Sequence, residues 1–226
     1  MEIQSYINTS SKRRLLNFSI LFLFLFTANS FAEYWLKTYV PPPFDTNHWL
    51  DVFFLDDDRD YGWVCGHSGL TLRTTDGGLN WEGSKIDSAQ HMESIHFVNR
   101  NVGYCSGVEG IFKSTDGGKT WRDVTPDTSR TYWGCYFVNE NTGLVLGGMG
   151  CVNNRQRFYR TSDGGNSWDY YEAYEVNTGL TDLILYDENG LGYAASSGLL
   201  WKTTDGGRSW SVFSNTGTNV WAEEIT

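Results

Sequence analysis

The sequence predicts an all-β protein, a β-propeller of four-stranded antiparallel blades. Three observations predict this class: one eight-residue motif occurs four times, glycine (25 residues) far outnumbers proline (4), and helical spacing of apolar residues is absent after the N-terminal apolar run. A repeat with a period of about 20 to 50 residues indicates one supersecondary unit stacked on itself. Glycine-dependent turns without helical periodicity favour short strands for that unit.

The N-terminal segment 1–32 has the pattern of a secretory signal peptide. Lys12, Arg13 and Arg14 precede the apolar run 15–26, and Ala32 ends the short segment after it. The run is shorter than the roughly 20 residues that a transmembrane helix needs. We therefore expect cleavage after Ala32, export to a periplasmic, lumenal or secreted location, and no membrane span in the cleaved product. A retained signal that acts as an anchor is the alternative.

The four motif copies divide the remaining chain, a propeller domain over 33–226, into blades. Their sequences are T-T-D-G-G-L-N-W, S-T-D-G-G-K-T-W, T-S-D-G-G-N-S-W and T-T-D-G-G-R-S-W, with aspartates spaced by 40, 47 and 42 residues. Apolar segments that read as strands precede each copy, and a fourth strand follows it. Four strands at this period are typical of propeller blades. The expected blades are 48–87, 90–127, 131–174 and 178–215.

The number of repeats leaves closure of the ring open. Propellers have about four to eight blades, and the domain has room for only four to five at the observed spacing. Residues 33–40 read as an outer strand without a blade, and 219–226 read as a first strand that ends midway. We expect an incomplete propeller that lacks a C-terminal portion. In the alternative, these two partial strands pair into a minimal closing blade.

The motif residues are expected to be structural. An aspartate in a turn accepts hydrogen bonds from backbone N–H groups ahead of it, and the two glycines supply positive φ. The closing tryptophan is expected to lie across the hairpin at the outer edge of its blade, where no neighbouring blade covers it. Identical catalytic or metal sites would not be needed once per blade. The structural residues are Asp76, Gly78, Trp81, Asp116, Gly118, Trp121, Asp163, Gly165, Trp168, Asp205, Gly207 and Trp210.

These motifs resemble Asp-box, or BNR, repeats of the form Ser/Thr-x-Asp-x-Gly-x-Thr/Ser-Trp, with Asn80 replacing the hydroxyl residue in the first copy. Together with the strands around them, over roughly 49–221, they resemble the photosystem II stability/assembly factor family. The resemblance implies an exported or lumenal propeller of seven blades that helps to assemble a protein client and catalyses no reaction. Kelch repeats are longer, and the Gly-His and Trp-Asp signature of WD repeats is absent.

Asp-boxes also occur in sialidases and other glycoside hydrolases, so a carbohydrate-binding or carbohydrate-cleaving propeller is the alternative function. A sialidase clamps the sugar carboxylate with arginines and carries an Arg-Ile-Pro signature, which this sequence lacks. A glycosidase needs two carboxylates, and Asp51 and Asp182 occupy equivalent positions, but the other repeats have Ser94 and Gly134 there. We therefore expect no enzymatic activity.

Charge and motif spacing argue against several other sites. The formal net charge of −10 opposes binding to nucleic-acid phosphates. The sequence has no Cys-x-x-Cys pair and only one close cysteine–histidine pair, which argues against zinc. The acidic segment 56–60 lacks the glycine and glutamate of an EF-hand loop and reads as a solvated turn. We expect no nucleic-acid partner, no metal and no cofactor.

The loops opposite the motif turns form the expected partner-binding face, because loops on a rigid scaffold often carry function. The longest insertion, 149–156, accounts for the spacing of 47 residues. A tolerated loop insertion is the alternative interpretation. For a protein client, or for a glycan, we expect a polar and basic patch made by His48, His67, His91, Arg130, Asn153, Asn154, Arg155 and Arg157.

A second basic series stands three residues before each motif aspartate: Arg73, Lys113, Arg160 and Lys202. A partner role is conceivable for these side chains, but we expect them to form ion pairs with neighbouring acids, which contribute little stability when exposed.

The cysteines are too few to form a disulfide framework. Cys135 is expected to be buried in the core. Cys65 and Cys105 occupy different registers of equivalent strands, so we expect them to point to opposite faces and not to pair. A bond between Cys135 and Cys151 would require the insertion to fold back.

Overall fold

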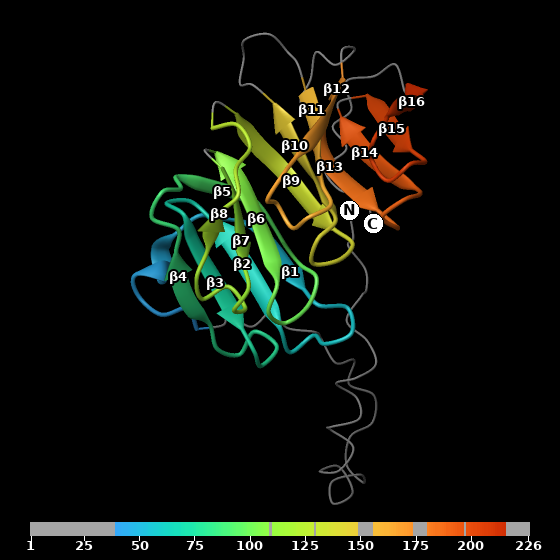
Figure 1. Ribbon diagram of the computed structural model, residues 1–226. Helices are drawn as coiled ribbons and strands as arrows, with labels where there is room; N and C mark the ends of the chain where they lie inside the picture. The colour runs from blue at the N-terminus through green and yellow to red at the C-terminus, as the bar shows by residue number, and fades with distance from the viewer. Residues whose placement is uncertain are drawn as a thin grey trace, which may run out of the picture. The chain divides into compact units, whose positions relative to one another are not determined.

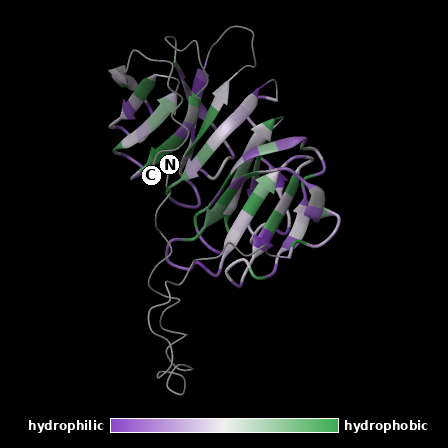
Figure 2. Cartoon of the chain, turned by 180° about the vertical axis from the view of Figure 1, so that it is seen from behind, coloured by the Kyte–Doolittle hydropathy of each residue, from purple (hydrophilic) through white to green (hydrophobic). Residues whose placement is uncertain are grey.

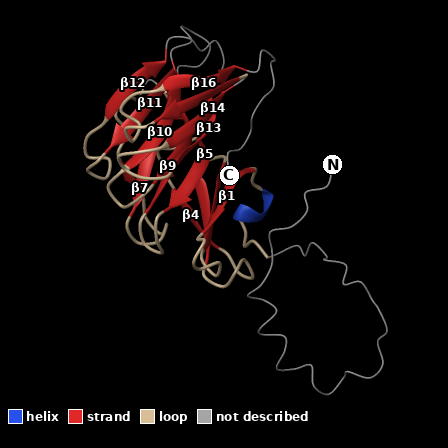
Figure 3. Ribbon diagram, turned by 90° about the vertical axis from the view of Figure 1, so that its right-hand side faces the viewer, coloured by secondary structure: helices blue, strands red, loops and turns tan. Residues whose placement is uncertain are grey.

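The computed structural model describes residues 39–108, 110–128, 130–148, 156–173, 180–196 and 198–215. The expected signal peptide, the C-terminal partial strand and most of the N-terminal partial strand lie outside these ranges. The described residues form sixteen strands and one short 3₁₀ helix, η1 (Phe44–Thr46), with no α-helix (Figure 3). None of their helical segments is long and apolar enough to cross a membrane. The predicted all-β class is confirmed.

The strands form four antiparallel four-stranded units, here called blades 1 to 4 (Figure 1). Blade 1 contains β1 (Trp49–Phe54), β2 (Gly62–Gly66), β3 (Leu70–Thr74) and β4 (Glu82–Lys85). Blade 2 contains β5 (His91–Phe97), β6 (Gly103–Val108), β7 (Gly110–Ser114) and β8 (Arg122–Asp123). Blade 3 contains β9 (Thr131–Phe137), β10 (Gly143–Gly148), β11 (Gln156–Thr161) and β12 (Asp169–Ala173). Blade 4 contains β13 (Leu180–Leu185), β14 (Gly192–Ser196), β15 (Leu199–Thr203) and β16 (Ser211–Asn215).

The first strand of each blade lies innermost, and these strands contact one another in chain order, β1 with β5, β5 with β9 and β9 with β13. Blades 2 and 3 also share one ladder pair, Val108 with Thr131, which joins them into a single eight-stranded sheet. This arrangement of four-stranded sheets around their first strands is the propeller architecture that the repeats predicted.

The apolar core lies at the three seams between blades rather than at one centre. In blades 1 and 2, the second residue of the second strand faces the next blade. Trp63 stacks on Phe97 with ring centroids 3.7 Å apart, and Tyr104 stacks on Phe137 at 3.4 Å. Figure 2 shows hydrophobic residues concentrated on the strands of the blades. Because each buried aromatic side chain stabilises the fold by about 1.5–3 kcal/mol, the seams hold the blades together.

Two cysteines expected to point to opposite faces lie in one buried cluster. Cys65 and Cys105 do project from opposite faces of equivalent strands, but the blades are adjacent, so these faces meet at the first seam. Both thiols are fully buried, Sγ of Cys65 donates to the carbonyl of Met92 at 3.3 Å, and burial raises the pKa of both. Both are free, as expected. Cys135 is buried and free, and Cys151 lies outside the described residues.

Candidate functional site

Each Asp-box turn is closed by its own aspartate. In blade 3, Oδ1 of Asp163 accepts hydrogen bonds from the Thr161 hydroxyl and the Ser167 backbone N–H, both at 2.9 Å, and Oδ2 accepts from the Ser167 hydroxyl at 2.6 Å. Equivalent bonds surround Asp76, Asp116 and Asp205. The eight box glycines have φ between 71° and 88°, the region that favours glycine.

These hydrogen bonds keep the box carboxylates ionised. The hydroxyl and backbone N–H of Ser167 lower the pKa of Asp163 to about 2, and the side chain of Asn80 lowers the pKa of Asp76. Burial opposes the shift at Asp116 and Asp205, but hydrogen bonds from the turns outweigh it and lower both pKa values. A carboxylate held in this way is a poor proton donor near neutral pH.

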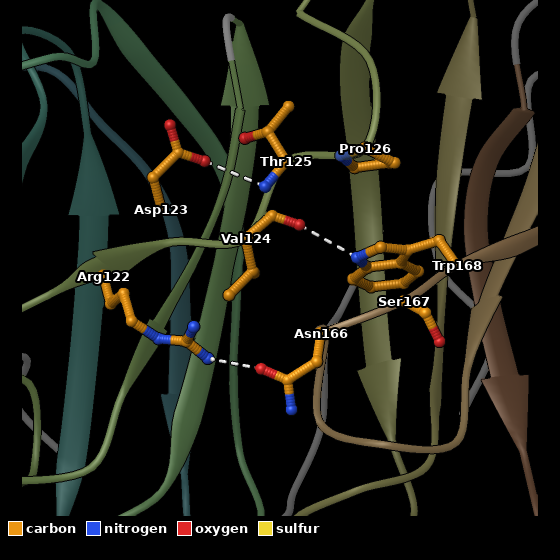
Figure 4. Close-up of a pocket in the computed structure, with 9 residues that line it drawn as sticks. Arg122, Asp123, Val124, Thr125, Pro126, Asn166, Ser167 and Trp168 are labelled. Atoms are coloured by element: carbon orange, nitrogen blue, oxygen red, sulfur yellow. Dashed lines mark hydrogen bonds between the residues drawn. The ribbon is translucent and has the colours of Figure 1, made fainter.

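The box turns also contact the neighbouring blade, which corrects the expectation for two tryptophans. Trp168 donates its indole N–H to the carbonyl of Val124 in blade 2 at 2.8 Å, beside a cavity of about 470 Å³ (Figure 4). Trp210 is buried and stacks on Phe158 of blade 3 at 4.2 Å. The box hairpin therefore leans over the seam instead of facing solvent. Trp81 and Trp121 remain edge-on against rings of their own blades.

The basic residues before the boxes join adjacent blades at two seams. Nε of Arg160 donates to the carbonyl of Gly206, at 2.9 Å, in the next box. Nζ of Lys113 lies 3.3 Å from the carbonyl of Gly164 in the next box and 3.1 Å from that of Glu140. The expected pairing with an acid holds for Arg73, which binds Glu82. It is wrong for Lys113 and Arg160, because box carbonyls that point toward them offer nearer acceptors.

Lys202, the last of this basic series, lies over aromatic rings of its own blade. Its Nζ atom is 5.9 Å from the ring centre of Tyr193 and 5.4 Å from that of Phe213.

The histidines of the expected partner face gather at one end of blades 1 and 2. The ring of His67 lies 5.2 Å from that of His48 and 4.3 Å from that of His91. Among the described residues, no group of three or more histidine, cysteine, aspartate or glutamate side chains is arranged to hold a metal ion.

The two arginines of that face that the structure describes are not exposed contacts. Arg130 is buried and binds Asp127 at 3.0 Å. Arg157 lies 3.8 Å from the same carboxylate and 3.4 Å from Glu172, and its guanidinium lies over the ring of Tyr170. These charges are used inside blade 3 and its entry loop, because the acids lie close enough to neutralise them. Asn153, Asn154 and Arg155 lie outside the described residues.

The innermost strands form a groove that the sequence did not reveal. This inner groove has a volume of about 740 Å³ and draws its walls from all four blades. Three of its apolar side chains are exposed: Leu50 (43 %), Val52 (59 %) and Trp133 (39 %). No local signal in the sequence marks this groove, because Ile95, Cys135 and Leu183, the equivalents of the exposed Val52, are buried.

Polar side chains tie the innermost strands together at the floor of the inner groove. The Asp51 carboxylate accepts the backbone N–H of Val52 at 2.7 Å and that of Ile95, in the next blade, at 2.8 Å. Ser94 accepts the N–H of Cys135 in the same way, at 3.3 Å. The equivalent repeat positions therefore serve the fold, which explains why Asp51 and Ser94 are interchangeable there.

His96 lies in the groove wall between Phe53 and Tyr136, with ring centroids 4.7 and 4.5 Å away. Burial lowers its pKa to about 4, so the imidazole is neutral at neutral pH. Its Nδ1 atom is buried and has no hydrogen-bond partner in the described part of the chain.

Comparison with known proteins supports the fold and the family resemblance. The sequence model of the family described as "Photosynthesis system II assembly factor YCF48" matches residues 30–130. The chain is 33% identical over 55 residues to the chloroplastic photosystem II stability/assembly factor HCF136 of Cyanidioschyzon merolae. This alignment covers 24% of the chain and 13% of that protein. The HCF136 protein of Oryza sativa subsp. japonica is 36% identical over 64 residues, with coverage of 27% and 15%. The chain thus matches only a small part of the length of these relatives.

Two solved structures align with most of the chain. YCF48 from Cyanidioschyzon merolae has a TM-score of 0.58 at 17% identity, over 84% of this chain and 67% of that one. An ancestral GH74 enzyme has a TM-score of 0.63 at 16% identity, over 73% of this chain and 24% of that one. At these identities the structural likeness shows the propeller fold alone. The chain is thus a propeller of BNR repeats that is similar, over part of its length, to photosystem II assembly factors.

Proposed function

We propose that the chain is an exported, non-catalytic scaffold that binds a protein client during assembly of a larger complex, as its assembly factor relatives are named for doing. The family match over residues 30–130 and the two HCF136 alignments support this role. The pattern of 1–32 supports export. The chain would then present a rigid stack of blades to its client.

One observation carries the proposal. The carboxylate of each Asp-box accepts hydrogen bonds from its own turn, so these repeated polar groups are already bound within the fold. Large apolar side chains, in contrast, remain exposed on the innermost strands. Four separated, saturated aspartates supply no shared reaction centre. An open surface that combines exposed apolar and polar side chains is typical of protein-binding sites.

A binding experiment with a catalytic control tests this function. The purified chain, immobilised, is presented with solubilised unassembled photosystem II polypeptides and, separately, with the assembled complex. We expect retention of an unassembled polypeptide and no release of sugar from a xyloglucan oligosaccharide or a fluorescent sialoside. Sugar release at a rate above that of a heat-denatured sample would overturn the non-catalytic assignment.

Export has its own test. When the full chain is produced with an intact secretion pathway, N-terminal sequencing of the exported product should begin at Glu33. An intact N-terminus on a chain that stays inside the cell would contradict export.

A further inference from the structure

The inner groove is lined by ionisable side chains that can carry only negative charge at neutral pH. Four carboxylates line it, from Asp51, Asp56, Glu93 and Asp182, and its lining contains no lysine or arginine. His96 adds no positive charge at neutral pH, because its imidazole is buried and neutral. Walls of low polarizability around a single sign of charge strengthen the attraction for an opposite charge.

The four carboxylates of the groove differ in the number of hydrogen bonds and ion pairs that they already form. Asp51 is bound to two backbone N–H groups, and Asp182 accepts the N–H of Leu183 at 2.8 Å. Asp56 and Glu93 form no ion pair within the part of the chain that the structure describes, and Asp56 is exposed. Two acids are thus available to a ligand, and two serve mainly the fold.

Backbone N–H groups of the innermost strands that line the groove already have hydrogen-bond partners. The N–H groups of Val52, Ile95, Cys135 and Leu183 each donate to a side chain of an innermost strand. A peptide therefore has little edge to which it could add as a further strand. Binding here must depend on side chains, and the exposed Leu50, Val52 and Trp133 provide apolar contact area between the acids.

We propose that the inner groove binds an extended cationic segment of a protein client, in which lysine or arginine side chains alternate with large apolar ones. The inference rests on the proposed function and names the chemistry of the client. The cationic groups pair with Asp56 and Glu93, and the apolar side chains cover Val52 and Trp133. The buried Nδ1 of His96, unpartnered among the described residues, offers one further polar contact along the wall.

The test measures binding of a fluorescent peptide of alternating arginine and leucine by anisotropy. In the groove variant, Asp56→Asn with Glu93→Gln, we expect the Kd to rise at least tenfold. The matched control, Asp57→Asn with Asp60→Asn, changes the net charge equally at two exposed acids outside the groove lining, and should alter the Kd less than twofold. Equal weakening by both variants would overturn the proposal, because it would show general attraction to an acidic protein.

Two further binding measurements separate the apolar contribution to peptide affinity from the electrostatic one. Trp133→Ser should weaken the arginine–leucine peptide several-fold, and a peptide of alternating glutamate and leucine should not bind. Binding of the glutamate peptide with similar Kd would also overturn the proposal. The unfolding midpoints of all variants should match that of the unchanged protein, since the substituted side chains do not lie in the seams.

The same variants distinguish this inference from the proposed function. If the immobilised protein retains a photosystem II polypeptide and the groove variant retains it equally, the groove inference fails while the scaffold function stands. If the groove variant loses the polypeptide and the control keeps it, both stand. Sugar release in the catalytic control contradicts the scaffold function whatever the peptide does.

Discussion

The Asp-box turns and the innermost strands belong to the same repeat, but the residues of the turns are nearly the same in every copy and those of the strands differ. The box is nearly unchanged in four copies, and its carboxylates, glycines and indoles are used in turns and seams. The innermost strands keep their backbone geometry, but equivalent groove positions hold Asp51, Ser94, Gly134 and Asp182. The box side chains are thus fixed by the turns that they close, whereas the first-strand position varies although Asp51 and Ser94 there both accept a backbone N–H from the next blade.

The largest expected effect lies in a box turn. Gly77 and Gly206 occupy equivalent positions with φ of 71° and 73°, so alanine strains both backbones equally. A Cβ on Gly206 would lie 2.1 Å from the carbonyl oxygen of Glu188, whereas on Gly77 the nearest atom is 3.7 Å away. We expect Gly77→Ala to cost about 1–2 kcal/mol and Gly206→Ala about 1–3 kcal/mol more, by chemical denaturation.

Equal losses at the two glycines would show that the box turn of blade 4 has room to move. That result would weaken the view that box turns are held tightly against the rest of their blades.

The next effect concerns the seam between blades 3 and 4. Arg160→Met removes the donor to the Gly206 carbonyl and leaves it unsatisfied in a buried place, so we expect a loss of about 1–3 kcal/mol in the free energy of unfolding. Lys202→Met is the matched control, because Lys202 contacts aromatic rings of its own blade at more than 5 Å and should cost about 0.5–1 kcal/mol. A larger loss of unfolding free energy for Lys202→Met than for Arg160→Met would contradict the role of Arg160 in joining adjacent blades.

A third prediction uses the buried imidazole of the inner groove. The folded pKa of His96 is about 4, below its ordinary value of 6.5, so the unfolded chain takes up a proton in this window and the folded chain does not. His96 therefore makes the protein less stable as the pH falls from about 6.5 to 4, by roughly 1 kcal/mol per pH unit.

His96→Phe should reduce this dependence, measured as the difference in unfolding free energy between pH 7 and pH 4.5 for the two proteins. Other titrating groups are common to both and cancel. If the difference in unfolding free energy between pH 7 and pH 4.5 is the same in both proteins, the imidazole of His96 is in contact with water.

The smallest effect is expected on the groove surface. Val52 is 59 % exposed, so Val52→Thr should change the unfolding free energy by less than about 0.5 kcal/mol. A loss as large as that of Arg160→Met would mean that the innermost strands are covered by packing, and the contrast between box and groove would not hold.

The sequence was a good guide to local structure and a poor one to surfaces. Each blade has three strands before its box and a fourth after it, as the repeats predicted, because alternation and glycine turns are local signals. The partner face was less well predicted. The three histidines do lie together, but Arg130 pairs with the nearby Asp127, and Arg157 pairs with the same carboxylate although it lies far from it in the sequence. The inner groove was missed because its residues come from four strands far apart in the chain.

By itself, the sequence determined the number of repeats, the strands within each blade and the turns that close them, since these depend on residues only a few positions apart. Only the tertiary structure decided which faces of neighbouring blades meet. That choice brought Cys65 to Cys105, Arg160 to the Gly206 carbonyl and Trp133 to the groove. The physical reason is that both faces of each blade are apolar enough to be buried, so side-chain packing between blades decides which contacts form.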